Sequence, residues 1–218
     1  MLGLRKGETE FHRHDPKWAS EAKQTISQLK AVFKDYACDI QHIGSTAVKK
    51  IKAKPVIDIA VGVSDLRVAD ILKKKLKFSG FILDNARSNE KRRIFFRLAY
   101  SEKDNASVKT HNIYVVQHNS KLWLDYIIFR DYLNINDGKA HEYESLKLTL
   151  KGKYKYSLPS YVKAKADFIR QTIDDNFCAM LLGKSVTINI NLSLGSANPA
   201  SPADVQPPST SRSRQTSA

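Results

Sequence analysis

A short apolar segment that carries one acid, residues 56–63, most constrains what this chain can fold into. Branched residues recur in it at every second position and predict the buried face of a β-strand: Ile57, Ile59, Val61 and Val63. The other face presents Asp58 beside Ala60 and Gly62. A carboxylate on a buried strand is costly unless a metal, a hydrogen bond or a cation compensates for the lost water. Asp58 is therefore either a ligand-binding group or a structural partner of a lysine or a neighbouring turn.

A small-residue turn, Gly44-Ser45-Thr46, precedes this strand, and Ser45 stands 13 residues before Asp58. Glycine lets the backbone approach a ligand closely, and the amides and hydroxyls of such a turn can hold phosphate oxygens. Most turns of this composition only reverse the chain, but a Gly-Ser pair followed by an acid within an apolar strand is a more specific pattern. It resembles the nucleotidyltransferase fold of the DNA polymerase beta superfamily. In that fold the turn grips a triphosphate and strand carboxylates hold divalent metal, which implies these roles for the turn and for Asp58.

The chain is strongly basic, with 36 lysines and arginines against 22 acids and a net charge of +14. This excess favours a polyanionic partner, whether nucleotide phosphates, RNA or an acidic membrane surface. A solvated basic surface without a specific partner is the alternative. No apolar run approaches the length of a membrane span and the N-terminus lacks a signal-peptide core, so no membrane partner is expected. Cys38 and Cys178 have no metal or disulfide spacing, which suits a reducing cytosol and predicts a cytoplasmic protein.

Hydrophobic periodicity predicts a succession of strands and helices with a helical C-terminal half. The resemblance implies how they are arranged: an α/β (α+β) fold with a nucleotidyltransferase-like mixed sheet flanked by helices. The expected strands are residues 40–43, 56–63, 81–84, 94–100 and 111–116. Helices are expected from Asp15-Pro16 to about residue 36, after Ser64-Asp65, and from Ser120, Asp137 and Pro159 onward.

One domain is assigned to residues 1–176, because a chain of 218 residues can bury a core of ordinary size. Residues 177–218 are assigned to a tail. Within it, residues 185–194 alternate weakly like a strand. Residues 195–218 are almost without apolar side chains and are expected to be disordered.

Four basic or ionisable side chains outside the turn are further candidates for phosphate binding. Lys54 lies between the turn and the Asp58 strand, where a cation could meet developing negative charge. Arg97 on a predicted strand is either an exposed edge residue or a phosphate clamp. His111 and Asn112 open the last predicted strand and could be directed at the same site, although a histidine near a strand end is also often structural. Arg130 lies in an apolar helix face beside Asp131, which indicates a structural salt bridge or a substrate contact.

Several separated motifs together resemble the GrpB family, a bacterial cytosolic group with the nucleotidyltransferase fold. The motifs span roughly residues 12–170 in the family's order: Asp15-Pro16-Lys17-Trp18, residues 42–48, residues 53–59, residues 110–116, Phe129-Arg130-Asp131-Tyr132-Leu133, residues 143–147, residues 161–165 and Phe168-Ile169. The stretch at 42–48 and the Phe-Arg-Asp-Tyr-Leu run are quite specific. Some members are fused to dephospho-coenzyme A kinase, so the resemblance implies nucleotide or coenzyme A chemistry.

Two departures from the family pattern bear on catalysis. The turn usually continues Val-Pro-Gly, whereas Val48 is followed here by Lys49 and Lys50, which adds charge where phosphates are expected. Active nucleotidyltransferases also present a second acid two residues after the first and a third acid on a neighbouring strand. Here the second position is Ala60, and residues 111–116 contain no acid. Because two-metal chemistry needs several carboxylates, tight binding of Mg²⁺ by Asp58 alone is hard to justify.

Three functions therefore remain open. The first is a nucleotidyltransferase that uses Mg²⁺ at Asp58, with phosphate at Ser45 and charge stabilisation by Lys54 or Arg97. The second is a binding module for a nucleotide, a coenzyme A precursor or another phosphorylated small molecule, without a chemical step. The third is an RNA-associated protein that uses its lysine-rich surface. The acid count favours the second over the first, and the turn with its strand acid disfavours the third.

Overall fold

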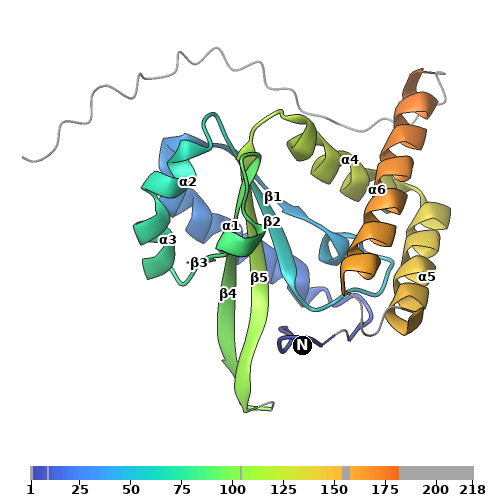
Figure 1. The fold of residues 1–218 in the computed structure, drawn as a ribbon, viewed down its shortest axis with the longest axis horizontal. Helices are drawn as coiled ribbons and strands as arrows, with labels where there is room; N and C mark the ends of the chain where they lie inside the picture. The colour runs from blue at the N-terminus through green and yellow to red at the C-terminus, as the bar shows by residue number, and fades with distance from the viewer. Residues whose placement is uncertain (1, 9, 104, 154–157, 182–218) are drawn as a thin grey trace, which may run out of the picture. The chain divides into compact units, whose positions relative to one another are not determined.

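A computed structural model describes residues 2–8, 10–103, 105–153 and 158–181. Its described residues form a five-stranded sheet in the order β1-β2-β5-β4-β3 (Figure 1). The strands are β1 Ala37–Ile43, β2 Ile57–Val63, β3 Ile82–Leu83, β4 Arg92–Ser101 and β5 Ala106–Gln117. Strand β2 pairs with β5 in parallel, while the other neighbours are antiparallel. The predicted mixed sheet is confirmed.

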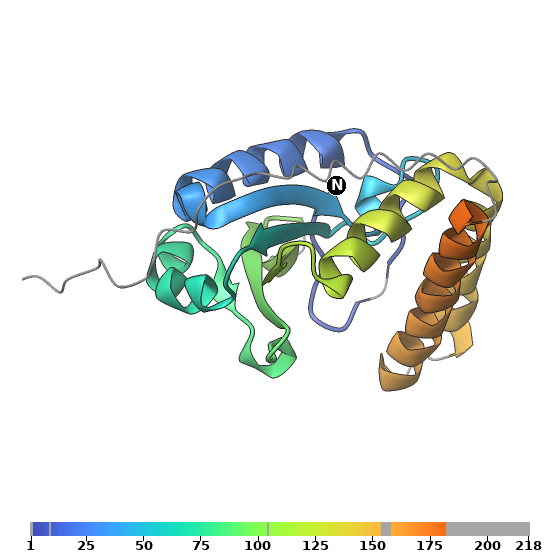
Figure 2. The ribbon, with the colours of Figure 1, turned by 90° about the horizontal axis from the view of Figure 1, so that it is seen from above.

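Helices cover both faces of this sheet (Figure 2). Their bounds are α1 Lys17–Phe33, α2 Arg67–Ile71, α3 Lys73–Phe78, α4 Lys121–Ile135, α5 Asp137–Lys153 and α6 Leu158–Leu181. Helices α1, α2 and α3 pack on one face, in a core that includes the four branched residues of β2 predicted to be buried. Helix α4 packs on the other face around Ala60, Val116 and Trp123. Helices α4, α5 and α6 share a further apolar cluster with the connector that precedes β2.

Helix α4 starts at the predicted cap, whereas α1 begins at Lys17, one residue after the predicted Pro16. Asp15 accepts a hydrogen bond from the Lys17 amide at 3.0 Å, next to the start of α1. Ser120 is the N-cap of α4, because its hydroxyl accepts from the amide of Trp123. Predicted strand lengths were less accurate: β5 is longer than residues 111–116, and β3 is shorter than residues 81–84.

The N-terminal segment is part of the packed structure, although its sequence reads as a polar lead-in. Leu4 forms a bridge with Lys109 at the start of β5, and His12 forms one with Ala53 in the connector. The amide of Gly3 also donates to the carbonyl of Pro55. These contacts hold Phe11 beside the connector that joins the Gly-Ser turn to β2.

Helix α6 continues to Leu181, past the predicted end of the domain at residue 176. Residues 182–218 lie outside the described residues, and with them the predicted strand at 185–194 and the predicted disorder at 195–218. Within the part of the chain that is described, no helix is both long and apolar enough to cross a membrane.

Candidate functional site

The Gly-Ser turn and the strand acid meet, as the sequence predicts. In the antiparallel pairing of β1 with β2, Ile43 lies opposite Asp58, so the turn after β1 folds back over the carboxylate. Gly44 has φ +71°, which favours glycine, and a Cβ added there would lie 2.5 Å from Asp58 Oδ2. The bare Cα of Gly44 is therefore required for this close approach.

The carboxylate of Asp58 is held by polar side chains from the parallel neighbour β5. Asp58 Oδ1 accepts from Asn112 Nδ2 at 2.9 Å and from the Tyr114 hydroxyl at 3.3 Å. The register pairs Asp58 with Asn112 and Ala60 with Tyr114, which places these side chains on one face. Burial raises the pKa of Asp58, and the hydrogen bond from Asn112, the charge of Lys165 and the Tyr114 hydroxyl oppose that rise.

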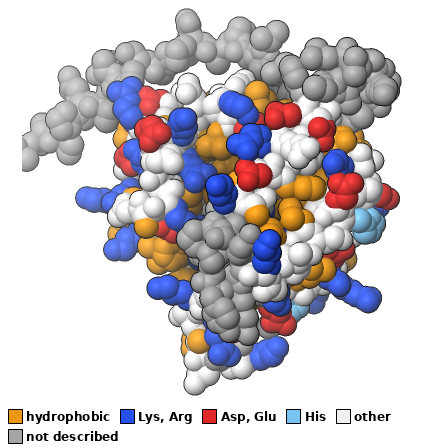
Figure 3. All heavy atoms as spheres, turned by 45° about the vertical axis from the view of Figure 1, so that its right-hand side comes forward, with side chains coloured by type: hydrophobic (Ala, Val, Ile, Leu, Met, Phe, Trp, Pro, Cys, Tyr) orange, Lys and Arg blue, Asp and Glu red, His pale blue; other side chains and the backbone are white. Residues whose placement is uncertain are grey.

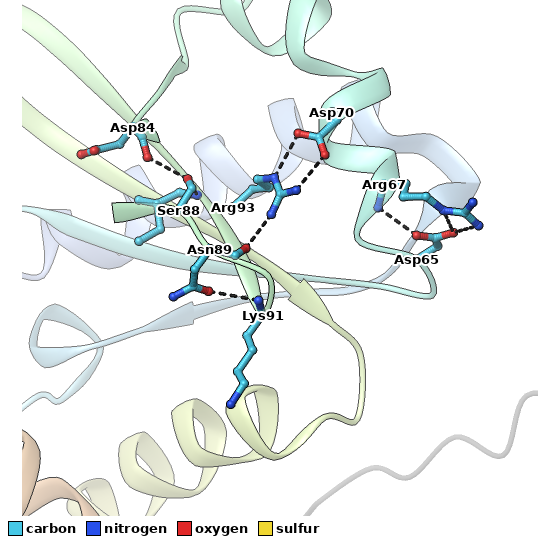
Figure 4. A network of polar contacts seen from close by, with 9 residues as sticks. Asp65, Arg67, Asp70, Asp84, Ser88, Asn89, Lys91 and Arg93 are labelled. Atoms are coloured by element: carbon cyan, nitrogen blue, oxygen red, sulfur yellow. Dashed lines mark hydrogen bonds and ion pairs between the residues drawn. The ribbon is translucent and has the colours of Figure 1, made fainter. Parts of the chain in front are cut away.

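The orientation of the Asn112 amide is set by Arg87. An Arg87 N–H donates to Asn112 Oδ1 at 3.1 Å, so the amide nitrogen of Asn112 is directed at Asp58. Arg87 is held in turn by Asp84, with 2.6 Å between Arg87 Nε and Asp84 Oδ2. Figure 4 shows Ser88 donating to the Asp84 carbonyl in the β3–β4 connection. A chain of side chains therefore fixes which groups Asp58 meets.

The connection between β3 and β4 is also linked to α2, through a contact between Arg93 and Asp70. Figure 4 shows the guanidinium of Arg93 donating to both carboxylate oxygens of Asp70, at 3.0 Å each, and to the carbonyl of Asn89. A two-point contact of this kind restricts orientation as well as distance. We infer that the segment carrying Asp84 and Arg87 is anchored at both ends.

The side chains around Asp58 do not fit a two-metal centre. Asp58 Oδ1 already accepts two hydrogen bonds, and Asn112 presents a donor where a third acid is expected. Ala60 is fully buried in the apolar cluster with Val116 and Trp123, so the position of the second acid is covered by hydrocarbon. Across the described ranges, no group of three or more His, Cys, Asp or Glu side chains could hold a metal ion. We therefore derive no chemical step through Mg²⁺.

Replacing Asn112 by aspartate is expected to create the metal affinity that the native site lacks. The change exchanges an N–H donor for a second carboxylate beside Asp58, and paired carboxylates are relieved of their repulsion by a divalent cation. We expect Mn²⁺ to raise the melting temperature of Asn112→Asp and to leave that of the native protein unchanged. Asn85→Asp, which adds a carboxylate at an exposed position, is the control. An equal shift for the native protein would show that Asp58 binds metal without help.

Ser45 faces the C-terminal helices. Its hydroxyl donates to the Tyr143 hydroxyl on α5 at 3.4 Å. Tyr143 is buried and stacks on Phe168 of α6 with 5.6 Å between ring centroids. Thr46, in contrast, is buried and hydrogen-bonds the His42 ring at 2.9 Å. Within the turn, Ser45 therefore contacts α5, whereas Thr46 contacts His42 at the end of β1 and stabilises the turn.

Lysines gather around the same tyrosine and around Phe11. We call Lys54, Lys147, Lys151 and Lys165 the lysine cluster. The amino groups of Lys54, Lys147 and Lys151 lie 5.7–6.0 Å from the centroid of the Phe11 ring. Those of Lys147 and Lys165 lie 4.5 and 5.8 Å from the Tyr143 ring. The cluster therefore joins the connector, α5 and α6 beside the Gly-Ser turn.

Burial and mutual repulsion act on the lysine cluster. Burial lowers the pKa of Lys147 to about 7, helped by the charges of Lys165 and Lys54 and opposed by Glu144. Burial likewise lowers the pKa of Lys54 to about 8, with contributions from Lys165 and Lys151 and an opposing one from Asp58. Lys147 is 2% exposed, and its amino group donates to the Lys52 carbonyl at 2.7 Å. Concentrating positive charge here is costly unless an anion compensates for it.

Two predicted phosphate-binding residues lie on the opposite face of the sheet. His111 pairs with Ile57 rather than with Asp58, and its ring is buried between Thr25 of α1 and Thr110. Arg97 lies over the Phe81 ring, 4.0 Å from its centroid, and donates to Gln28 and to the Ser79 carbonyl. The structure does not bring these two residues together with the Gly-Ser turn.

Arg130 and Lys50 are engaged in structural contacts on the turn's own side. Arg130 pairs with Asp131 at 2.7 Å and donates to Gln41 and to the carbonyl of His42, which ties α4 to β1. Lys50 pairs with Asp137 at the start of α5 at 2.6 Å. The Arg130 salt bridge is formed with its neighbour within α4, so it does not tie two helices together as predicted; the hydrogen bonds to Gln41 and His42 are the contacts that link α4 to β1.

Sequence reasoning missed Lys147, Lys151 and Lys165, and it missed Phe11 in the N-terminal segment. One signal was available: Tyr143, Lys147 and Lys151 follow each other at intervals of four, which places them on one face of a helix. Figure 3 shows basic side chains spread over the face that it presents, with acids between them. What the members of the lysine cluster share is their packing on the rings of Phe11 and Tyr143.

Several known proteins are similar to this chain. The family model described as "GrpB protein" matches residues 8–175. "Glutamate-rich protein GrpB" of Alkalihalophilus pseudofirmus is 35% identical over 176 residues, which cover 80% of this chain and 99% of that protein. A dephospho-CoA kinase of Mycobacterium tuberculosis is 29% identical over 171 residues, and the chain spans only 42% of its length. The crystal structure of GrpB from Enterococcus faecalis superposes with a TM-score of 0.65 at 24% identity, covering 77% of this chain and 99% of that one.

Proposed function

This chain belongs to the GrpB family, and from that premise we propose that it binds a phosphorylated ligand of the nucleotide class without transferring a nucleotidyl group. The ligand's phosphate is bound at Gly44 and Ser45, with Lys54 providing positive charge. The observation that carries the proposal is the meeting of the Gly-Ser turn with Asp58 on one side and with the lysine cluster on the other.

Phosphate chemistry suits the groups that surround Ser45. A hydroxyl and a tight glycine turn offer hydrogen-bond donors, and ammonium groups supply charge. Asp58 repels phosphate, so we place the phosphate toward Tyr143 and Lys54 and leave Asp58 to accept a hydrogen bond from a neutral part of the ligand, such as a sugar hydroxyl. The similarity to part of a dephospho-CoA kinase makes coenzyme A precursors a natural class to test alongside nucleotides.

The catalytic alternative is not supported by the surroundings of Asp58. Nucleotidyl transfer by two metals needs carboxylates that hold both ions and stabilise the entering and leaving oxygens. Here Asn112 donates to Asp58, and Ala60 lies beneath α4. The binding function therefore accounts for the meeting of the turn with Asp58, whereas nucleotidyl transfer leaves the missing acids unexplained.

Calorimetric titration with ATP, UTP, dephospho-CoA and adenosine tests the proposal. We expect at least one phosphorylated ligand to bind in EDTA, and adenosine to bind far more weakly. Ser45→Ala should weaken that binding about tenfold or more, which corresponds to one hydrogen bond to a charged group. Ser27→Ala, at an exposed position of α1, is the matched control and should leave binding unchanged.

Two outcomes would contradict the proposal. The turn does not bind phosphate if none of the phosphorylated ligands binds. The same conclusion follows if Ser45→Ala leaves their affinity unchanged. Binding that requires Mg²⁺ and is abolished by Asp58→Asn, together with release of pyrophosphate from ATP, establishes the transferase instead.

A further inference from the structure

The lysine cluster carries more positive charge than one phosphate requires. Four amino groups from the connector, α5 and α6 are gathered against the rings of Phe11 and Tyr143. The hydroxyl of Tyr143 meets Ser45, so the cluster continues directly from the turn. Lys147 donates to the Lys52 carbonyl, which holds its amino group 4.5 Å from the Tyr143 ring centroid.

We propose that the lysine cluster binds the outer phosphates of a di- or triphosphate chain and that this binding takes up protons. The inference rests on the proposed function, since it assigns the chain's inner phosphate to Ser45. It adds residues of α5 and α6 to the site and selects polyphosphate over monophosphate ligands.

The position of the cluster supports selection by the length of the phosphate chain. The turn offers hydrogen-bond donors for one phosphate, and Asp58 on its other side repels further negative charge. A chain of phosphates is therefore directed away from Asp58, toward α5 and α6. There each added phosphate gains a further ammonium partner, and hydrogen bonds between charged groups are stronger than neutral ones.

The proton uptake follows from the charges that surround Lys54 and Lys147. Lys147 faces Lys165 and Lys54, together with Glu144 on its own helix. Lys54 faces Lys165, Lys151 and Asp58. With a pKa of about 7, Lys147 is partly protonated near neutral pH, and with a pKa of about 8, Lys54 is partly protonated near pH 8. A polyanion favours their charged forms, so their pKa values rise on binding and protons are absorbed.

The test uses inorganic tripolyphosphate, pyrophosphate and orthophosphate as probes, titrated calorimetrically into the whole protein. We expect affinity to increase with chain length, by at least tenfold from orthophosphate to tripolyphosphate. At pH 8, the apparent binding enthalpies measured in Tris and in HEPES should differ, and the sign of the difference should show that protons pass from the buffer to the complex. Affinity for tripolyphosphate should fall between pH 7 and pH 9, as Lys147 and Lys54 lose their protons.

Variants assign the effect to the cluster. Lys151→Gln and Lys165→Gln should each weaken tripolyphosphate binding about tenfold, the value of one hydrogen bond to a charged group, and should affect orthophosphate much less. Lys74→Gln on α3, which removes an exposed lysine outside the cluster, is the matched control. Circular dichroism and melting temperature establish that each variant is folded.

The outcomes separate this inference from the proposed function. If nucleotides bind in a manner that depends on Ser45 while both lysine variants match Lys74→Gln, the cluster has no role and the inference is overturned. If tripolyphosphate binding depends on Lys151 and Lys165 while Ser45→Ala is without effect on any ligand, the cluster is an anion site and the proposed function fails. Affinity that is equal for all three probes, or binding without proton uptake, also overturns the inference.

Discussion

Alanine at Gly44 is expected to destabilise the protein by roughly 2–6 kcal/mol, the sum of backbone strain and overpacking. The residue has φ +71° and ψ −169°, a conformation that side chains strongly disfavour. The added Cβ would also lie 2.5 Å from Asp58 Oδ2, where something must move. Urea unfolding monitored by tryptophan fluorescence measures the loss.

A matched control for this substitution exists in the N-terminal segment. Gly7 also has a positive φ, +89°, but a Cβ there would meet nothing within 4 Å. Gly7→Ala should therefore cost only about 1–2 kcal/mol of backbone strain. Asp58→Ala removes the nearest atom, so Gly44→Ala should cost less in that background. Equal losses for Gly44→Ala and Gly7→Ala would contradict the close packing of turn and acid.

Acidification from pH 6.5 to pH 4 is expected to cost the fold roughly 3 kcal/mol through His111 alone, from the shift in its pKa. Burial lowers the pKa of His111 to about 4, and the charges of Arg97 and His42 act in the same direction. Burial also lowers the pKa of His42 to about 4, with help from Arg130 and His14. The unfolded chain binds these protons first, at about pH 6.5, so stability is lost as pH falls through this window.

The measurement is the free energy of unfolding in urea at pH 7, 5.5 and 4. His111→Gln should lower stability at pH 7, because it disturbs contacts with Thr25 and Thr110, and should flatten the pH dependence. His141→Gln, at an exposed position of α5, controls for the loss of a histidine as such. Asp58 acts in the opposite direction because its pKa is raised, which reduces the total effect. An unchanged slope in His111→Gln would show that this ring is not held neutral.

Much of the framework could be predicted from the sequence because it depends on local periodicity. Alternation in residues 57–63 identified a buried strand, and the Gly-Ser pair ahead of the strand acid identified a turn that meets Asp58 through Gly44. The same alternation would have excluded His111 from the site, if the register between β2 and β5 had been known. In the parallel pairing His111 is level with Ile57 and Asn112 with Asp58, so the acid's partner is Asn112. That register is a property of the sheet and is not visible in either strand alone.

The lysine cluster could not be predicted because it is assembled by tertiary packing. Phe11 comes from a segment without periodicity, and it is positioned by backbone pairing of His12 with Ala53. Lys165 comes from α6, whose placement depends on the stacking of Phe168 on Tyr143. In the sequence, Lys147, Lys151 and Lys165 taken singly are typical of a solvated helix surface, and Lys54 is typical of a solvated connector. Only the structure shows that their amino groups all lie within 6.0 Å of the centroid of the Phe11 ring or the Tyr143 ring.

The burial of Ala60 limits how this scaffold could be redesigned. It lies in the cluster that α4 forms through Trp123 and Ile127, with no exposed surface of its own. An aspartate at this position would be an ion without water or a partner, at a cost of several kcal/mol. To obtain phosphoryl transfer from this scaffold, a protein engineer must therefore first redesign the face of α4 that packs on Ala60, and only then add acids. Substitutions confined to the strand would yield an unstable protein before they yielded an enzyme.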